Sequence, residues 1–163
     1  MIQLRVNTSS TWAPVALSAF DAFLIDHAAC ERKASSVGMS FVVRYPDRPE
    51  IIEPMILFAK EELDHFHQVV RIVQRRGCLL REDYPDPYIN QILAHVRTGR
   101  ETRLLDRLLI SCLIEARGHE RLGLITQELT DPELHKVYSR LTRAEGQHEE
   151  LFLRIAYRIF PEK

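Results

Sequence analysis

The sequence has few cysteines, and no two of them are close together. Cys30, Cys78 and Cys112 form no C-x-x-C pair. This spacing argues against a disulfide scaffold or a structural zinc site and fits reduced thiols. No apolar run approaches the ~18 residues that a membrane span needs. The N-terminus also lacks the apolar stretch of a signal peptide, because Asp21 and Asp26 interrupt it. We therefore expect a cytoplasmic protein with no membrane segment.

Lysine is scarce as well. Only 4 of the 22 basic residues are lysines, and the others are arginines. The planar guanidinium of arginine suits phosphate binding, whereas a genome rich in G+C would give the same bias, and both interpretations stay open. The formal net charge of −1 excludes a polycation, so any nucleic acid would have to bind a local basic patch.

Proline, glycine and aspartate concentrate in residues 44–50, 75–88 and 128–133. Between these segments, apolar residues recur at the spacing of a helix, and no segment alternates as a strand would. At 163 residues, the chain suits a single domain, residues 1–163. The pattern predicts four long helices and a short one, at residues 14–43, 50–76, 100–128, 131–160 and near 87–97.

The connections predict the topology. The first two long helices and the last two are each joined by a short loop, so each pair forms an antiparallel hairpin. A connection of about two dozen residues separates the hairpins, as in a ferritin-like all-α bundle with one long crossover. At the start of the last helix, either Thr130 forms a capping box with Glu133, or Asp131 caps with Pro132 in the first position.

Each long helix places one glutamate on the face that should be apolar. An ionised carboxylate there costs several kcal/mol unless it is paired or bound to a metal. Two of these glutamates are followed by a histidine three residues later, on the same helix face. The six residues are Glu31, Glu62, His65, Glu115, Glu145 and His148.

The spacing of these residues repeats. Glu31 precedes Glu62 by 31 residues, and Glu115 precedes Glu145 by 30. Two hairpins, each with Glu on one helix and Glu-x-x-His on the next, match the carboxylate-bridged two-metal site of ferritin-like bundles. Oxygen and imidazole ligands suit iron or manganese. The alternative is a metal-free bundle with buried ion pairs, such as Glu31 with His148.

The remaining candidates have two interpretations each. His27 and His119 lie one turn from a predicted ligand and either hydrogen-bond its carboxylate or are core residues. Cys30 and Cys112 are expected in the core. Several arginines flank the crossover and either gather into one basic surface or form a solvated, salt-bridged face. The candidate phosphate contacts are Arg71, Arg75, Arg97, Arg100 and Arg103.

Several segments resemble a known family. They are "DHAACERKASSVGMS", "EELDHF", "YPDPYINQI", "RLLDRLLISCLIEARGHER" and "DPELHKVYSRLTRAEGQH", and they span about residues 20–160. Together they are similar to bacterial tRNA hydroxylases that act on 2-methylthio-isopentenyl-adenosine beside the anticodon. The chain departs from that pattern at His119, where a small residue or cysteine is expected, and at Gly146, where alanine is expected.

The resemblance implies a ferritin-like monooxygenase whose two iron ions are held by the same six residues. It implies hydroxylation of the isopentenyl group with dioxygen and two electrons from a reductase or ferredoxin. The expected partner is the anticodon stem-loop of tRNA, and the expected state is a monomer or small homo-oligomer. The alternative function is an iron-handling or peroxide-reducing protein with the same ligands.

Overall fold

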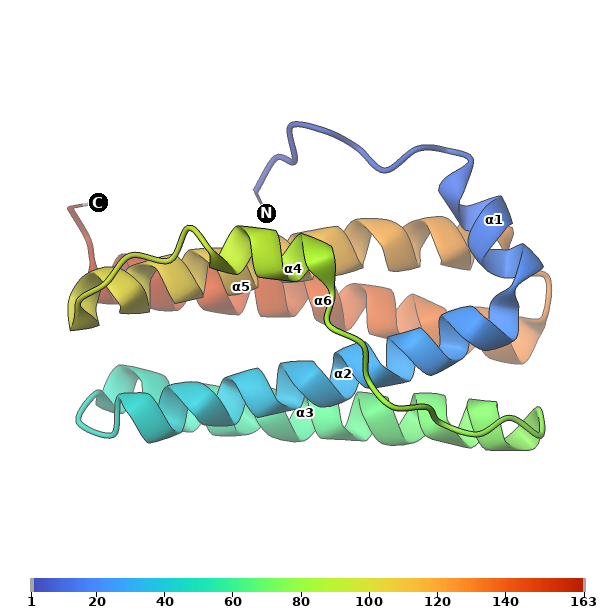
Figure 1. Ribbon diagram of the computed structural model, residues 1–163, viewed down its shortest axis with the longest axis horizontal. Helices are drawn as coiled ribbons and strands as arrows, with labels where there is room; N and C mark the ends of the chain where they lie inside the picture. Colours follow the sequence, from blue (N-terminus) through green and yellow to red (C-terminus); the bar gives the residue numbers. More distant parts are fainter. Residues whose placement is uncertain (1, 163) are drawn as a thin grey trace. The chain divides into compact units, whose positions relative to one another are not determined.

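The computed structural model describes residues 2–162, and all regular secondary structure in that range is helical. The chain forms two compact units, Val15–Asp83 and Met1–Pro14 with Tyr84–Lys163. The all-α prediction is confirmed, and that of a single domain stays a prediction. The helices are α1 (Trp12–Ser18), α2 (Phe20–Arg44), α3 (Pro49–Arg75), α4 (Pro87–Leu93), α5 (Arg100–Glu128) and α6 (Pro132–Ile159) (Figure 1).

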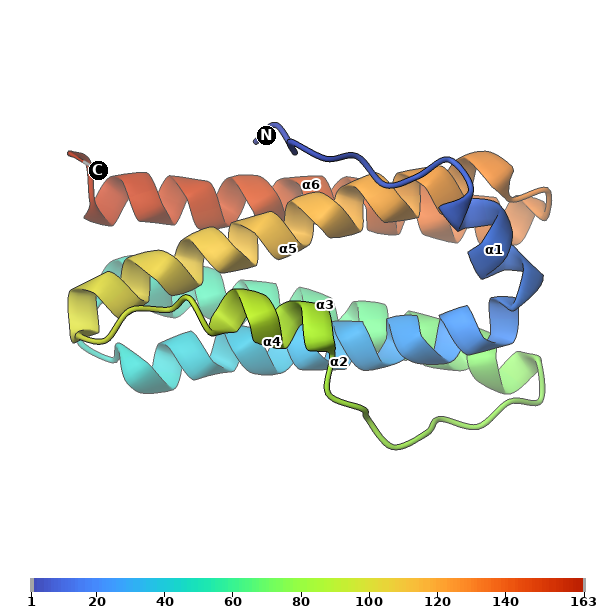
Figure 2. The ribbon, with the colours of Figure 1, turned by 45° about the horizontal axis from the view of Figure 1, so that its top comes forward.

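The unit Val15–Asp83 is a hairpin of α2 and α3, which lie side by side in Figures 1 and 2. Pro49 occupies the first turn of α3, where its missing N–H costs no hydrogen bond. Gly38 lets the two helices approach closely, because a Cβ at this position would lie 2.8 Å from Phe58 Cδ1 and 3.1 Å from the Met55 carbonyl oxygen. Leu24 and Met55 are fully buried.

The other unit contains the hairpin of α5 and α6, which pack against each other. Asp131 caps α6, since its carboxylate accepts hydrogen bonds from the backbone N–H groups of Glu133 (2.8 Å) and Leu134 (3.0 Å). This resolves the two capping alternatives in favour of Asp131, with Pro132 following it. The apolar faces of the two helices form a core. Its fully buried members include Leu104, Leu108, Tyr138, Leu141 and Phe152.

The N-terminal segment, residues 2–11, lies across α5 and α6 (Figure 2). The backbone N–H and the hydroxyl of Thr8 donate to Glu120 at 2.9 and 2.6 Å. Arg117 donates to the Val6 carbonyl oxygen at 2.9 Å. The N–H of Ile2 donates to the carboxylate of Glu149 on α6. These contacts join residues more than a hundred positions apart, so no local pattern in the sequence predicts them.

Two predicted helix boundaries and one predicted core residue were wrong. The helix predicted at 14–43 is interrupted at Ala19, whose φ and ψ of −124° and 46° leave the helical region. The short helix ends at Leu93, not near residue 97. Cys30 is exposed rather than part of the core, whereas Cys112 is buried as predicted.

No single helix among the described residues is long and apolar enough to cross a membrane, and α1 with α2 passes that test only as a pair bent by 104°.

Candidate metal centre

The unit Val15–Asp83 brings together three of the predicted ligands. Glu31 comes from α2, and Glu62 and His65 come from successive turns of one face of α3. Nδ1 of His65 lies 3.6 Å from Glu31 Oε2 and 3.9 Å from Glu62 Oε2. All three side chains are buried, with exposed fractions between 1% and 6%. The hairpin therefore gathers two carboxylates and one imidazole in a place shielded from water.

His27 supports Glu31 directly. Its Nε2 lies 2.6 Å from Glu31 Oε1, one helical turn away, and the histidine is itself buried. Burial alone would raise the pKa of Glu31, but the hydrogen bond from His27 and the nearby imidazole of His65 outweigh it and hold that pKa well below its usual range. Burial lowers the pKa of His65, and the contacts with Glu31 and Glu62 outweigh this effect and raise it to about 9. Glu31 is thus held as a carboxylate, the form that binds metal ions.

The unit containing α5 and α6 repeats this arrangement. Glu115 comes from α5, and Glu145 and His148 come from one face of α6. Nδ1 of His148 lies 3.6 Å from Glu115 Oε2. Each of the three residues offers one ligand atom within 4.8 Å of the others. Their exposed fractions lie between 3% and 8%. Each unit therefore contains a buried triad of Glu and Glu-x-x-His, which we call its half-site.

Both half-sites have the chemistry and spacing of metal ligands. Carboxylate oxygens and imidazole nitrogens bind first-row divalent ions at about 2.1 Å, so two ligands of one ion are roughly 3 to 4 Å apart. The nitrogen-to-oxygen distances of 3.6 Å within each half-site fall in this range. They are longer than the 2.7–3.2 Å of a hydrogen bond. The residues present thus fit a metal ion.

The sequence did not reveal that Gly118 shapes one half-site. A Cβ atom at this position on α5 would overlap Oε2 of Glu145 and lie 3.2 Å from its Cδ. A glycine inside a helix costs about 1 kcal/mol relative to alanine, so its presence in α5 calls for a local reason. The space it leaves for the Glu145 carboxylate supplies that reason.

Glu149 is a second residue that the sequence pattern did not single out. It follows His148 on α6, and its exposed fraction is only 2%. Besides accepting from Ile2, it lines a cavity of about 490 Å³ between the N-terminal segment and the helices, together with Arg5 and His119. The pKa of the Cys112 thiol is raised to about 11, chiefly by burial and secondly by the charge of Glu149.

His119 contacts the backbone of α6. Its Nδ1 donates to the Thr142 carbonyl oxygen at 2.7 Å. A Cβ at position 146 would lie 3.1 Å from the same nitrogen. The two departures from the expected family pattern, His119 and Gly146, therefore lie against each other, and the histidine ring occupies space that the glycine leaves.

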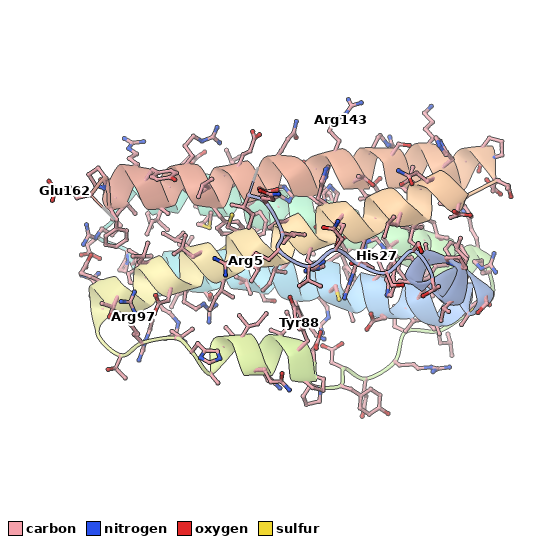
Figure 3. The ribbon with its side chains drawn as sticks, turned by 90° about the horizontal axis from the view of Figure 1, so that it is seen from above. Arg5, His27, Tyr88, Arg97, Arg143 and Glu162 are labelled. Atoms are coloured by element: carbon pink, nitrogen blue, oxygen red, sulfur yellow. The ribbon has the colours of Figure 1, made fainter. Side chains whose placement is uncertain are left out.

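The five arginines proposed as phosphate contacts lie in different units. Arg71 and Arg75 are exposed on α3. Arg97 lies just before the start of α5 (Figure 3). It forms a two-pronged ion pair with Asp106, with nitrogen-to-oxygen distances of 2.6 and 2.9 Å. Arg100 and Arg103 are exposed in the first turn of α5. Arg97 is therefore already engaged, and the grouping of the five into one surface stays a prediction.

The helix order and the two half-sites define a class of protein, the ferritin-like all-α proteins. A solved chain described as "Protein 43 with aldehyde deformylating oxygenase activity" from Synechococcus matches with a TM-score of 0.89 and 37% identity, covering 97% of this chain and 79% of that one. The predicted ferritin-like fold is confirmed. Residues 2–163 match the family described as tRNA-(MS2IO6A)-hydroxylase (MiaE), and the chain belongs to this family.

Two relatives agree with this assignment, and both are named tRNA 2-(methylsulfanyl)-N(6)-isopentenyladenosine(37) hydroxylase. The protein from Pseudomonas putida is 35% identical over 154 residues, which are 94% of this chain and 75% of the relative. The protein from Salmonella typhimurium is 34% identical over 113 residues, which are 69% of this chain and 42% of the relative. The predicted membership of a tRNA hydroxylase family is thereby confirmed.

Proposed function

We propose that this chain is a non-haem di-iron monooxygenase that hydroxylates the isopentenyl group of (2-methylthio-)isopentenyl-adenosine beside the anticodon of tRNA. One observation carries the proposal: a buried half-site of Glu and Glu-x-x-His occurs in each hairpin of a chain that belongs to the tRNA-(MS2IO6A)-hydroxylase family. The family supplies the substrate, and the half-sites supply ligands for the metal that such chemistry requires.

The two half-sites together would hold two iron ions. They provide four carboxylates and two imidazoles, from Glu31, Glu62, His65, Glu115, Glu145 and His148. Four negative charges balance two divalent ions, which offsets the cost of burying the carboxylates. Bound iron would supply the activation of dioxygen that hydroxylation of an unactivated C–H bond needs.

The chain's own residues orient the ligands and exclude water. The hydrogen bond from His27 fixes the direction of the Glu31 carboxylate. Gly118 leaves the space in which the carboxylate of Glu145 lies. Leu108 on α5 and Phe152 on α6 are fully buried and belong to the apolar core of the hairpin that carries the second half-site. A dry surrounding strengthens each electrostatic contact to the ligands.

The reaction also needs partners. Reduction of dioxygen to water alongside one hydroxylation consumes two electrons, and we propose a cytoplasmic reductase or ferredoxin as their source. We further propose that tRNA binds through its anticodon stem-loop, whose unstacked bases are accessible to a protein. A monomer or small homo-oligomer would suffice for both contacts.

Mass spectrometry of tRNA nucleosides tests the function. Cells lacking the gene should contain the isopentenylated nucleoside and none of its hydroxylated form, and the wild-type gene should restore the latter. Glu62→Ala should fail to restore it and should lower bound iron, because it removes a buried ligand. The matched control is Glu53→Ala, an exposed glutamate on the same helix. Full hydroxylation by Glu62→Ala would refute the proposed site.

A second candidate is deformylation of an aldehyde, favoured by the TM-score of 0.89 with the Synechococcus chain. It would use the same half-sites and the same metal. Purified iron-loaded protein with a reductant can be offered an aldehyde and isopentenylated tRNA in parallel. Turnover of the aldehyde alone would favour this second function. Uptake of iron or reduction of peroxide with neither substrate turned over would instead favour an iron-handling protein.

A further inference from the structure

The outward face of α6 carries an excess of positive charge. From Lys136 onward, its exposed residues recur every three or four positions, which places them in one line along the helix. Five of these are cations and one is an anion, and Glu133 in the first turn is a second exposed anion on the helix. In Figure 3, Arg143 projects from α6 away from α5. We call this line the α6 stripe, and its members are Lys136, Arg140, Arg143, Gln147, Glu150, Arg154, Tyr157 and Arg158.

The stripe is long enough to follow a phosphate backbone. With a rise of 1.5 Å per residue, Lys136 and Arg158 are about 33 Å apart along the helix axis. The cations form two groups. Lys136, Arg140 and Arg143 span about 10 Å, and Arg154 and Arg158 are about 6 Å apart. A rigid helix therefore presents several positive charges in fixed positions along one side.

These five cations are available for a ligand. Among residues 2–162, none of them forms an ion pair or a side-chain hydrogen bond with the rest of the chain. Arginines elsewhere are engaged: Arg32 pairs with Asp83, and Arg76 pairs with Asp21. A ligand binding to the stripe would thus break no internal pair. A free guanidinium can also bind two oxygens of one phosphate.

The charge excess is specific to α6. The exposed face of α3, a helix of similar length, carries equal numbers of cations and anions. They are Lys60, Arg71 and Arg75 against Glu53, Glu61 and Asp64. A general bias of the genome toward arginine would affect both helices, so it does not explain why α6 exposes five cations against two anions, Glu133 and Glu150. Balanced charge is what a solvated helix face ordinarily shows.

The chemistry of the stripe favours RNA over an anionic membrane. A helix that lies on a membrane needs an exposed apolar face beside its charges. The apolar face of α6 instead packs in the core, where Tyr138, Leu141 and Phe152 are buried. Tyr157, 60% exposed at one end of the stripe, is placed to stack on a base.

We propose that the α6 stripe binds the phosphate backbone of RNA and that this RNA is the body of the tRNA substrate, apart from the nucleoside that reacts. This inference rests on the proposed function, since the family membership makes tRNA the RNA in question. The stripe would raise the affinity for whole tRNA and would contribute nothing to the chemical step.

Salt-dependent binding of isopentenylated tRNA tests the stripe. Each phosphate contact contributes about 0.7 to 0.9 to the slope of log K against log salt. The quadruple variant Arg140→Gln, Arg143→Gln, Arg154→Gln, Arg158→Gln should lower the slope by about 3 and weaken binding at least tenfold. Glu150→Gln, which removes the one acidic side chain of the stripe, should tighten binding. The control pair Arg44→Gln and Lys60→Gln should change neither quantity.

A slope unchanged in the quadruple variant would overturn the inference. The inference would also be overturned if the quadruple variant lost the wild-type binding to phosphatidylserine vesicles but still bound tRNA normally. That result would make the stripe a membrane-binding surface. An assay on the free isopentenylated nucleoside distinguishes a failure of the stripe from a failure of the proposed function. The quadruple variant should still hydroxylate this nucleoside and should keep its bound iron. If wild-type protein hydroxylates nothing, the function fails, and tRNA binding still reports on the stripe.

Discussion

The carboxylate of Glu145 on α6 fills the space that a side chain at position 118 on α5 would occupy. A Cβ there would overlap Oε2 of the glutamate. Gly118→Ala should therefore displace a predicted ligand without deleting it. We expect a loss of roughly 10- to 100-fold in iron affinity, comparable to that of other changes next to metal ligands. Titration of the metal-free protein with ferrous iron would measure it.

Gly123→Ala is the matched control on α5. A Cβ at position 123 would lie 3.7 Å from Thr142 Cγ2, an ordinary contact. This variant should keep the iron affinity of the wild type and gain up to about 1 kcal/mol in stability, because alanine favours the helix. Equal iron affinity in both variants would show that the space at Gly118 is not needed for metal binding.

His27 should matter through the hydrogen bond that it makes to Glu31 Oε1 at 2.6 Å. His27→Ala should lower iron affinity by about tenfold or more while the protein stays folded, because the carboxylate loses the partner that orients it. His27→Gln keeps a nitrogen donor near the same position and should restore part of the affinity. His67→Ala, at an exposed position of α3, should have no effect. If all three variants bind iron with the same affinity, His27 does not orient the Glu31 carboxylate for metal binding.

The close packing of α2 on α3 at Gly38 predicts a stability effect. A methyl group there would lie 2.8 Å from Phe58 Cδ1 and 3.1 Å from the Met55 carbonyl oxygen, and the backbone atom has little room to move. Gly38→Ala should destabilise the fold by about 1 to 3 kcal/mol, as overpacked cores do. Thermal unfolding would report this as a fall of several degrees in Tm. A Tm equal to that of the wild type would show that the hairpin relaxes freely.

Attachment of the N-terminal segment should depend on pH through Glu120. Burial raises the pKa of Glu120, but hydrogen bonds from Thr8 and the ion pair with Arg117 outweigh it and lower the pKa below its ordinary 4.5. The stabilisation is therefore present above pH 4.5 and is lost as the pH falls through the lowered value. Hydrogen exchange at Thr8 should accelerate, relative to its intrinsic rate, in acid. Glu120→Gln should remove the pH dependence of hydrogen exchange at Thr8. If the variant keeps that pH dependence, a group other than Glu120 causes it.

The sequence predicted those features that depend on one helix at a time. Residues three apart share a face, so Glu62 with His65 and Glu145 with His148 were found from spacing alone. The cap at Asp131 is likewise local. Gly118 escaped notice because its role depends on where the tip of a side chain on another helix lies. The break at Ala19 escaped because the residues on both sides of it continue the apolar pattern of a helix.

The first described residues of the chain contact the helix that carries one of the predicted metal-binding half-sites. The N–H of Ile2 donates to Glu149, the neighbour of His148 in sequence. Trimming two residues from the N-terminus would remove a donor from a buried carboxylate one position away from a predicted iron ligand. A protein shortened at its start would therefore be a poor standard for iron content or turnover.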